Sequence, residues 1–232
     1  IPLMGPGIVN TRAGGDSPFL LQRLHQLLAG LRGGQFPVRW MPDAAYGLGY
    51  PFFNFYASLP YYVAAVFSLL GGGYTAALKL TQVLGMLAAA GGMYGFARQV
   101  LRDEAAAFLS AVMYAYAPFH LVNLYVRGDS LSEYWAFSFY PVILWALSSL
   151  SQRPSLRKSA LLALAYGGLV LTHNVSAMIF TPFAVLYGLM LLLGRSDGRC
   201  RFIRLGLIGA VLGLVWSSWF WGPALLERGY VQ

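Results

Sequence analysis

The sequence has little charge and almost no cysteine. Aspartate, glutamate, lysine and arginine make up 10% of its 232 residues, whereas a soluble globular domain has about a quarter. Its one cysteine, Cys200, excludes a disulfide framework and a zinc site built from cysteines. None of its glycine-rich runs continues into a GxxxxGK motif, which excludes a nucleotide-binding loop of that kind. This scarcity of charge excludes an ordinary soluble enzyme and a disordered chain.

The residues that are abundant indicate a multi-pass protein of the cell membrane. Hydrophobic residues make up 58% of the chain and aromatic residues 16%, and there are 27 glycines. Interfacial rings and close helix packing favour such a composition. We predict an all-α membrane protein with about six transmembrane helices, and we expect Ile1–Val9 to be the truncated tail of an earlier one. The six predicted spans are residues 75–97, 104–118, 133–150, 158–172, 175–194 and 203–221.

We expect residues 1–232 to form a single transmembrane domain and to be a fragment of a longer protein. Residues 10–74 are expected to form an extracytoplasmic loop with interfacial helices, and residues 75–221 a helical bundle. If residues 58–70 lie along the interface, one side holds nine basic and three acidic residues. These are Arg98, Arg102, Arg153, Arg157, Lys158, Arg195, Arg199, Arg201 and Arg204, with Asp103, Glu104 and Asp197.

The positive-inside rule places that basic group in the cytoplasm. The net charge of +8 is therefore explained by short loops, and nucleic acid is not predicted as a partner. All three histidines then fall on the opposite side, together with five of the eight acidic residues. We therefore expect any chemical site to face away from the cytoplasm.

The predicted outer loop opens with a helix-start signal, in which Ser17 can cap free amides and Pro18 suits the first helical position. Leucines then recur at helical spacing from Leu20 to Leu31, with polar residues on the other side, until Gly33-Gly34. This pattern predicts an amphipathic helix suited to the interface. The aromatic, glycine and proline residues between 36 and 56 form either an aromatic belt or a platform over a lipid-linked substrate.

Several motifs resemble those of a known family. They include residues 15–16, 24–25, 33–43, 47–56, 59–62 and 114–118, Tyr125–Gly128 with Glu133, residues 172–174 and residues 219–227. The chain looks like the bacterial integral membrane proteins of the 6-pyruvoyl-tetrahydropterin synthase-related family. The soluble pterin enzyme is an α+β protein, and six hydrophobic spans could not build its fold.

The same layout is similar to the GT-C superfamily of membrane glycosyltransferases, such as the protein mannosyltransferases and aminoarabinose transferases. In those enzymes an acidic residue lies early in the first outer loop, before interfacial helices and a bundle of spans. The resemblance rests on this architecture and on Asp16. It implies transfer of a sugar from a polyprenyl-phosphate carrier to an acceptor on the outer face, with membrane lipids as the surroundings.

Asp16 is the candidate catalytic base of such a transfer, since a carboxylate can take the acceptor's proton. Its alternative role is to cap the amphipathic helix. Arg127 could hold a phosphate, and Glu133 could act as a second catalytic carboxylate or a metal ligand. Alternatively, Glu133 belongs to a helix cap and Arg127 pairs locally with Asp129.

His173 and Asn174 interrupt a long apolar run, so they are expected either to line the site or to form a simple turn. His25 and Tyr56, which lie within the family-like motifs, are further expected substrate contacts.

A divalent metal could bind the histidines together with Asp16 and Glu133. None of these residues has a tight ligand spacing, so no metal site is assigned and no cofactor is certain.

The sequence therefore predicts a glycosyltransferase of the GT-C type that uses a polyprenyl-phosphate sugar. One alternative is a non-catalytic subunit that associates with other membrane subunits. Another is a transporter or flippase for lipid-linked intermediates, although no internal repeat is visible.

Overall fold

The computed structural model describes residues 5, 7–8, 17–127 and 130–230. These residues form helices joined by short turns, except for the long loop over residues 33–51. The one β-type pairing of the described residues is an isolated bridge within that loop, between Met41 and Tyr50. The elements are α1 (Ser17–Arg32), α2 (Phe52–Phe55), α3 (Leu59–Leu69), α4 (Tyr74–Leu101), α5 (Glu104–Ala115), α6 (Pro118–Leu121), the π-helix η2 (Val122–Val126), α7 (Leu131–Gln152), α8 (Leu156–Thr172), α9 (Asn174–Leu193), α10 (Arg199–Trp216), α11 (Ser218–Leu226) and the 3-10 turn η3 (Arg228–Tyr230).

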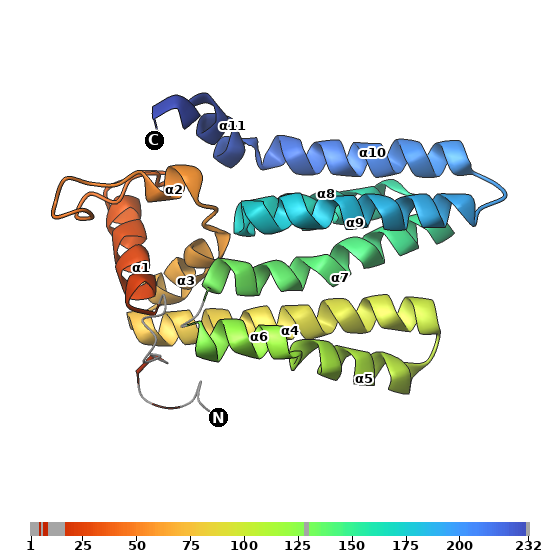
Figure 1. Ribbon diagram of the computed structural model, residues 1–232, viewed down its shortest axis with the longest axis horizontal. Helices are drawn as coiled ribbons and strands as arrows, with labels where there is room; N and C mark the ends of the chain where they lie inside the picture. The colour runs from red at the N-terminus through yellow and green to blue at the C-terminus, as the bar shows by residue number, and fades with distance from the viewer. Residues whose placement is uncertain (1–4, 6, 9–16, 128–129, 231–232) are drawn as a thin grey trace.

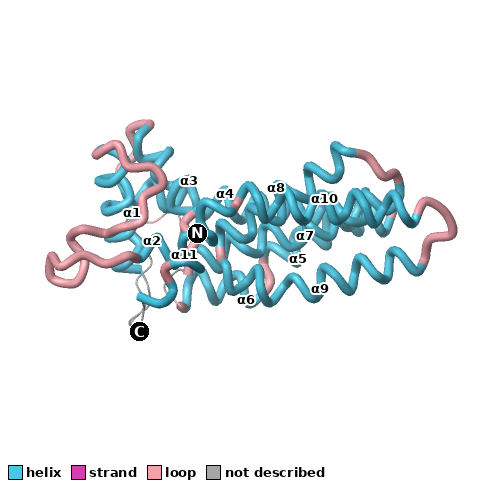
Figure 2. The backbone as a smooth tube through the Cα atoms, turned by 90° about the horizontal axis from the view of Figure 1, so that it is seen from above, coloured by secondary structure: helices cyan, strands magenta, loops and turns pink. Residues whose placement is uncertain are grey.

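The long helices run side by side and alternate in direction, so the bundle has two distinct ends (Figure 1). At one end α1 stands across the bundle, with α2 and α3 beside it; we call this the cap end. At the other, the basic end, lie the turns between α4 and α5, α7 and α8, and α9 and α10. Viewed from above, the loops gather at these same two ends (Figure 2). The nine basic residues predicted for one side of a membrane all lie in or next to the turns of the basic end.

All six predicted spans fall on helices, but fewer meet a strict test of length and hydropathy. Among the described residues, three helical segments are long and apolar enough to cross a membrane: α4, the segment Glu104–Val126, and α9. A fourth span results if α10 and α11, which meet at a 65° bend, are counted together. The helices over 133–150 and 158–172, α7 and α8, pack within the bundle but fall outside that count.

Helix α1 forms because its leucines recur on one face, as predicted. Leu20, Leu24 and Leu27 have no exposed surface, because α3 and the following loop cover them within a shared core. One residue of the predicted polar side, Gln26, is also buried. Its amide donates to Asp43 Oδ2 at 2.7 Å and accepts from the Asp43 amide at 3.1 Å, which fixes the loop against α1. The apolar face of α1 is therefore buried inside the protein.

Glycines let the long helices pack closely. A Cβ on Gly167 of α8 would lie 2.2 Å from Trp216 Nε1 and 2.6 Å from the Gly213 carbonyl oxygen of α10. The Trp216 indole N–H donates to the Ala163 carbonyl oxygen at 3.0 Å, so the close contact is also hydrogen-bonded. Small residues serve this purpose where helices meet in an apolar medium. This packing holds the C-terminal end of α8, and the turn after it, in a fixed place at the cap end.

Candidate functional site

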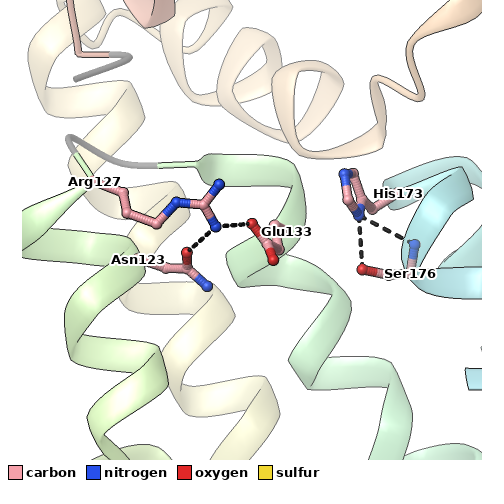
Figure 3. Close-up of polar contacts among 5 residues, drawn as sticks. All are labelled: Asn123, Arg127, Glu133, His173 and Ser176. Atoms are coloured by element: carbon pink, nitrogen blue, oxygen red, sulfur yellow. Dashed lines mark hydrogen bonds and ion pairs between the residues drawn. The ribbon is translucent and has the colours of Figure 1, made fainter. Parts of the chain in front are cut away.

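A polar cluster at the cap end joins η2 to the start of α7 (Figure 3). The Arg127 guanidinium donates through Nη1 to Glu133 Oε2 at 2.5 Å and to Asn123 Oδ1 at 3.0 Å. The Arg127 side chain is 50% exposed and that of Glu133 is 21% exposed. One edge of the guanidinium is thus held by two acceptors, while half of the side chain stays accessible.

Two local features of the chain position this cluster. The π-helical turn η2 carries Asn123 and ends at Val126. The next residue, Arg127, donates its backbone N–H to the Val122 carbonyl oxygen at 2.9 Å. Such turns often occur at functional sites. Glu133 lies in the first turn of α7, where the helix dipole favours a negative charge. The arginine and the carboxylate therefore approach each other from two adjacent segment ends.

Asn123 has no exposed surface, and its Nδ2 has no hydrogen-bond partner among the described residues. Its oxygen faces Arg127, which can only donate. Asn123 is therefore a fixed acceptor for the arginine, and it was not among the predicted site residues. Its signal in the sequence is weak, because a single asparagine in an apolar segment does not reveal which side of the helix it occupies.

His173 lies on the same end of the bundle, in the turn between α8 and α9. Its Nδ1 accepts the Ser176 backbone N–H at 3.3 Å and lies 2.6 Å from the Ser176 hydroxyl, so it caps α9. Burial lowers the pKa of His173 below 6.5; the nearby Glu133 opposes this shift and Arg127 adds to it. The imidazole is therefore neutral near pH 7, and with Nδ1 as acceptor its proton is on Nε2.

Aromatic rings connect His173 to the loop. The Tyr56 ring meets the His173 ring edge-on at 6.2 Å between centroids and stacks on Phe52 at 4.6 Å. The Arg23 guanidinium of α1 lies 4.5 Å from the centroid of Phe52, a cation–π contact. The predicted residues Tyr56 and His173 thus lie together, although about 117 positions separate them in the sequence.

Asn174, the first residue of α9, borders a different feature. It lines an apolar cavity of about 670 Å³ together with Phe55, Tyr166 and Trp221. This cavity lies between α8, α9 and the bent pair α10–α11. The Asn174 side chain is therefore beside an apolar space suited to a hydrocarbon chain rather than within the charged cluster.

Of the remaining predicted residues, those that the structure describes do not join this group. Asp16, the predicted base, lies outside the described residues. His25 of α1 pairs with Tyr74 at 3.1 Å between Nδ1 and the hydroxyl oxygen, and His120 is buried among aromatic rings, 4.7 Å from that of Phe137. Within the described part of the chain, no three histidine, cysteine, aspartate or glutamate residues gather as a metal ion would require.

A second polar link, which the sequence did not predict, joins α2 and the loop before it to α11. Arg39 donates to Asn54 Oδ1 at 2.9 Å and to the Trp219 carbonyl oxygen at 3.1 Å. The Asn54 amide donates in turn to Glu227 Oε2 at 2.7 Å. In the sequence, Glu227 is only the last residue of the family-like motif 219–227. Its partners lie too far away in the chain for spacing to reveal them.

Taken together, the cap end offers a half-accessible cation, a carboxylate and a neutral imidazole. Such a set can bind an anionic oxygen through Arg127 and exchange a proton through Glu133 or His173. The apolar cavity beside Asn174 lies at the same end, where it could hold the hydrophobic part of an amphiphile. The geometry therefore suits a ligand with an anionic head and a hydrocarbon tail.

Comparison with known proteins agrees with the family resemblance. Residues 53–232 match the family described as 6-pyruvoyl-tetrahydropterin synthase related domain, a membrane protein. An uncharacterized protein of Lactococcus lactis subsp. cremoris (strain MG1363) is 24% identical over 222 residues. The match covers 93% of this chain and 36% of that relative, so the chain spans little more than a third of the relative's length. No solved structure matches the chain. Since the family match extends over most of its length, the chain belongs to the 6-pyruvoyl-tetrahydropterin synthase-related family of membrane proteins.

Proposed function

We propose that this protein is a glycosyltransferase of the GT-C type that takes its sugar from a polyprenyl-phosphate carrier. The observation that carries the proposal is the Arg127 guanidinium, which is held by Asn123 and Glu133 yet stays half accessible. A guanidinium fixed in this way is suited to a phosphate, because its planar donors match phosphate oxygens.

In this proposal Arg127 binds the carrier phosphate and stabilises the negative charge that develops as the sugar departs. Asp16 is the base that accepts the acceptor's proton, and Glu133 is the second carboxylate. His173 and Tyr56 line the position of the sugar, and the cavity beside Asn174 takes the first isoprene units. His25, which contacts Tyr74 at the start of α4, would hold α1 in place and would not contact the reacting atoms.

The proposed topology has six spans, with α7 and α8 added to the segments that meet the strict test. It places the basic end in the cytoplasm and the cap end outside, as the positive-inside rule favours. The site would then meet lipid-linked sugars on the extracytoplasmic face.

Binding of a polyprenyl phosphate tests this function. Purified protein in lipid nanodiscs is titrated with a short-chain polyprenyl phosphate and, separately, with the corresponding polyprenol. Arg127→Gln should weaken binding of the phosphate about tenfold or more, because a charge-assisted contact is lost. Arg201→Gln, an exposed arginine at the basic end, is the matched control and should bind like the unmodified protein. Equal binding of the phosphate and the alcohol, or normal binding by Arg127→Gln, would refute the assignment.

Transfer itself is tested with Asp16→Asn and Glu133→Gln. Both variants should bind the polyprenyl phosphate, while release of a radiolabelled sugar from the carrier should fall to the background level. Full release by Asp16→Asn would end its assignment as the base.

A second function is favoured by one specific contact. The Glu133 carboxylate is already engaged by Arg127 at 2.5 Å, as expected if both residues only hold segments together in a non-catalytic subunit of a membrane complex. In that case the polyprenyl phosphate does not bind, and other membrane subunits co-purify with the protein from the native membrane.

A further inference from the structure

A second polar cavity lies at the basic end, far from the cap-end cluster. Its volume is about 650 Å³, and residues from the C-terminal parts of α4 and α7 and from the start of α5 line it. These segments meet at the basic end of the bundle (Figure 1). The lining includes Arg98 and Gln99 from α4, Arg102 directly after that helix, and Trp145 from α7. Neither the family resemblance nor the proposed function uses these residues.

One wall of this cavity is rigidly built. The Trp145 ring lies flat against α4 at Gly95, where a Cβ would be only 2.9 Å from the ring. The indole N–H donates to Gln99 Oε1 at 2.9 Å, and the Ser149 hydroxyl donates to the same oxygen at 2.6 Å. Because an indole nitrogen can only donate, these contacts fix which end of the Gln99 amide is the oxygen.

The Gln99 amide nitrogen is consequently left with two donors to satisfy. It is buried and has no hydrogen-bond partner among the described residues. A buried donor without an acceptor is unfavourable, so this nitrogen favours a ligand that can accept. It marks the point at which a bound group would be recognised.

Among the charged side chains that line the cavity, one arginine has no partner in the described part of the chain. The Glu104 carboxylate is bound by Arg98 at 2.7 Å and accepts from the Tyr94 hydroxyl. The Asp103 carboxylate caps α5 by accepting the Ala106 backbone N–H at 2.6 Å. Both acids are therefore engaged. The Arg102 backbone N–H donates to the Arg98 carbonyl oxygen at 3.0 Å, but its side chain makes no hydrogen bond or ion pair with any other residue that the structure describes.

We propose that this cavity binds a phosphate group carrying net negative charge, with Arg102 and the Gln99 amide as its donors. A phosphate offers several acceptor oxygens, which both groups lack within the protein. The further arginines in the neighbouring turn at this end, Arg153 and Arg157, add a positive potential that attracts anions. The phosphate belongs either to the headgroup of an anionic lipid or to a soluble phosphate compound.

Two variants test this site in the full chain. Gln99→Glu keeps the oxygen that Trp145 and Ser149 need, but it replaces the amide donors with an acceptor that repels an anion. Arg102→Gln removes the unpaired cation from an exposed position, so it leaves the fold intact even if Gln99→Glu does not. Arg201→Gln, at the same end but outside the cavity lining, is the control.

The protein in detergent micelles is titrated with phosphatidylglycerol and, separately, with inorganic phosphate, and bound ligand is counted by native mass spectrometry. Each cavity variant should bind about tenfold more weakly than the control. Binding of phosphatidylglycerol alone identifies a lipid headgroup as the source, and displacement of that lipid by inorganic phosphate identifies a soluble one. Equal affinity in all variants, or an equal loss in Arg201→Gln, would overturn the proposal.

Discussion

The ion pair between Arg127 and Glu133 should stabilise the fold more than the other ion pair of the described chain, that between Arg98 and Glu104. The first joins a half-exposed arginine to a largely buried glutamate, with side-chain exposures of 50% and 21%, whereas the second pair has exposures of 59% and 63%. Water screens the second pair more, and exposed pairs of its kind typically contribute about 0.2–1 kcal/mol. We expect a coupling energy of about 1–2 kcal/mol for Arg127 and Glu133, between the values typical of exposed and buried pairs.

A double-mutant cycle measures this difference. The variants Arg127→Gln, Glu133→Gln and their combination are unfolded in mixed micelles, with tryptophan fluorescence as the signal, and the coupling is taken from the free energies of unfolding. The same cycle on Arg98 and Glu104 is the control. Equal coupling energies in the two cycles, or a coupling near zero for Arg127 and Glu133, would refute the argument from burial.

Two further perturbations test the packing and the cap of α9. Gly167→Ala should destabilise the protein by about 1–3 kcal/mol, because the new Cβ would meet Trp216 at 2.2 Å. Gly91→Ala in α4, with nothing within 4 Å, should not destabilise it and should gain up to about 1 kcal/mol from the helix propensity of alanine. The free energy of unfolding should also decrease as the pH falls through 6.5, because burial lowers the pKa of His173 below that value and the unfolded chain then binds more protons. His173→Asn, which can still cap α9, should flatten this dependence; an unchanged pH profile would contradict it.

The helices were predictable because composition and periodicity act locally. The leucine stripe predicted the existence of α1 and which of its faces is apolar, and Gly33-Gly34 marked its end. The sequence placed that face in the membrane interface, whereas the structure buries it within the protein. The sorting of basic residues to one end of the bundle also followed from the sequence, since it depends only on counting the helices between the charged turns. The side of the membrane on which each end lies remains a prediction.

The contacts within the site were less accessible to prediction. The family-like motifs and the expected topology selected Arg127, Glu133, His173 and Tyr56, but they could not show that Arg127 pairs with Glu133. His25 was selected with the same reasoning, yet the rotation of α1 directs it to α4, and only tertiary packing sets that rotation. Asn123 was missed because a π-helical turn, which no sequence pattern announced, brings it beneath the arginine.

The bond between Asn54 and Glu227 also has a consequence for synthesis. These residues are 173 positions apart, and ribosomes add about 5–20 residues per second. Helix α2, which carries Asn54, is therefore synthesised about 9–35 s before Glu227. During that interval Arg39 and Asn54 lack the acceptors that the last helix supplies. The cap end is therefore complete only once α11 and Glu227 have been made, and nascent chains that stall before α11 should expose it to proteases and chaperones.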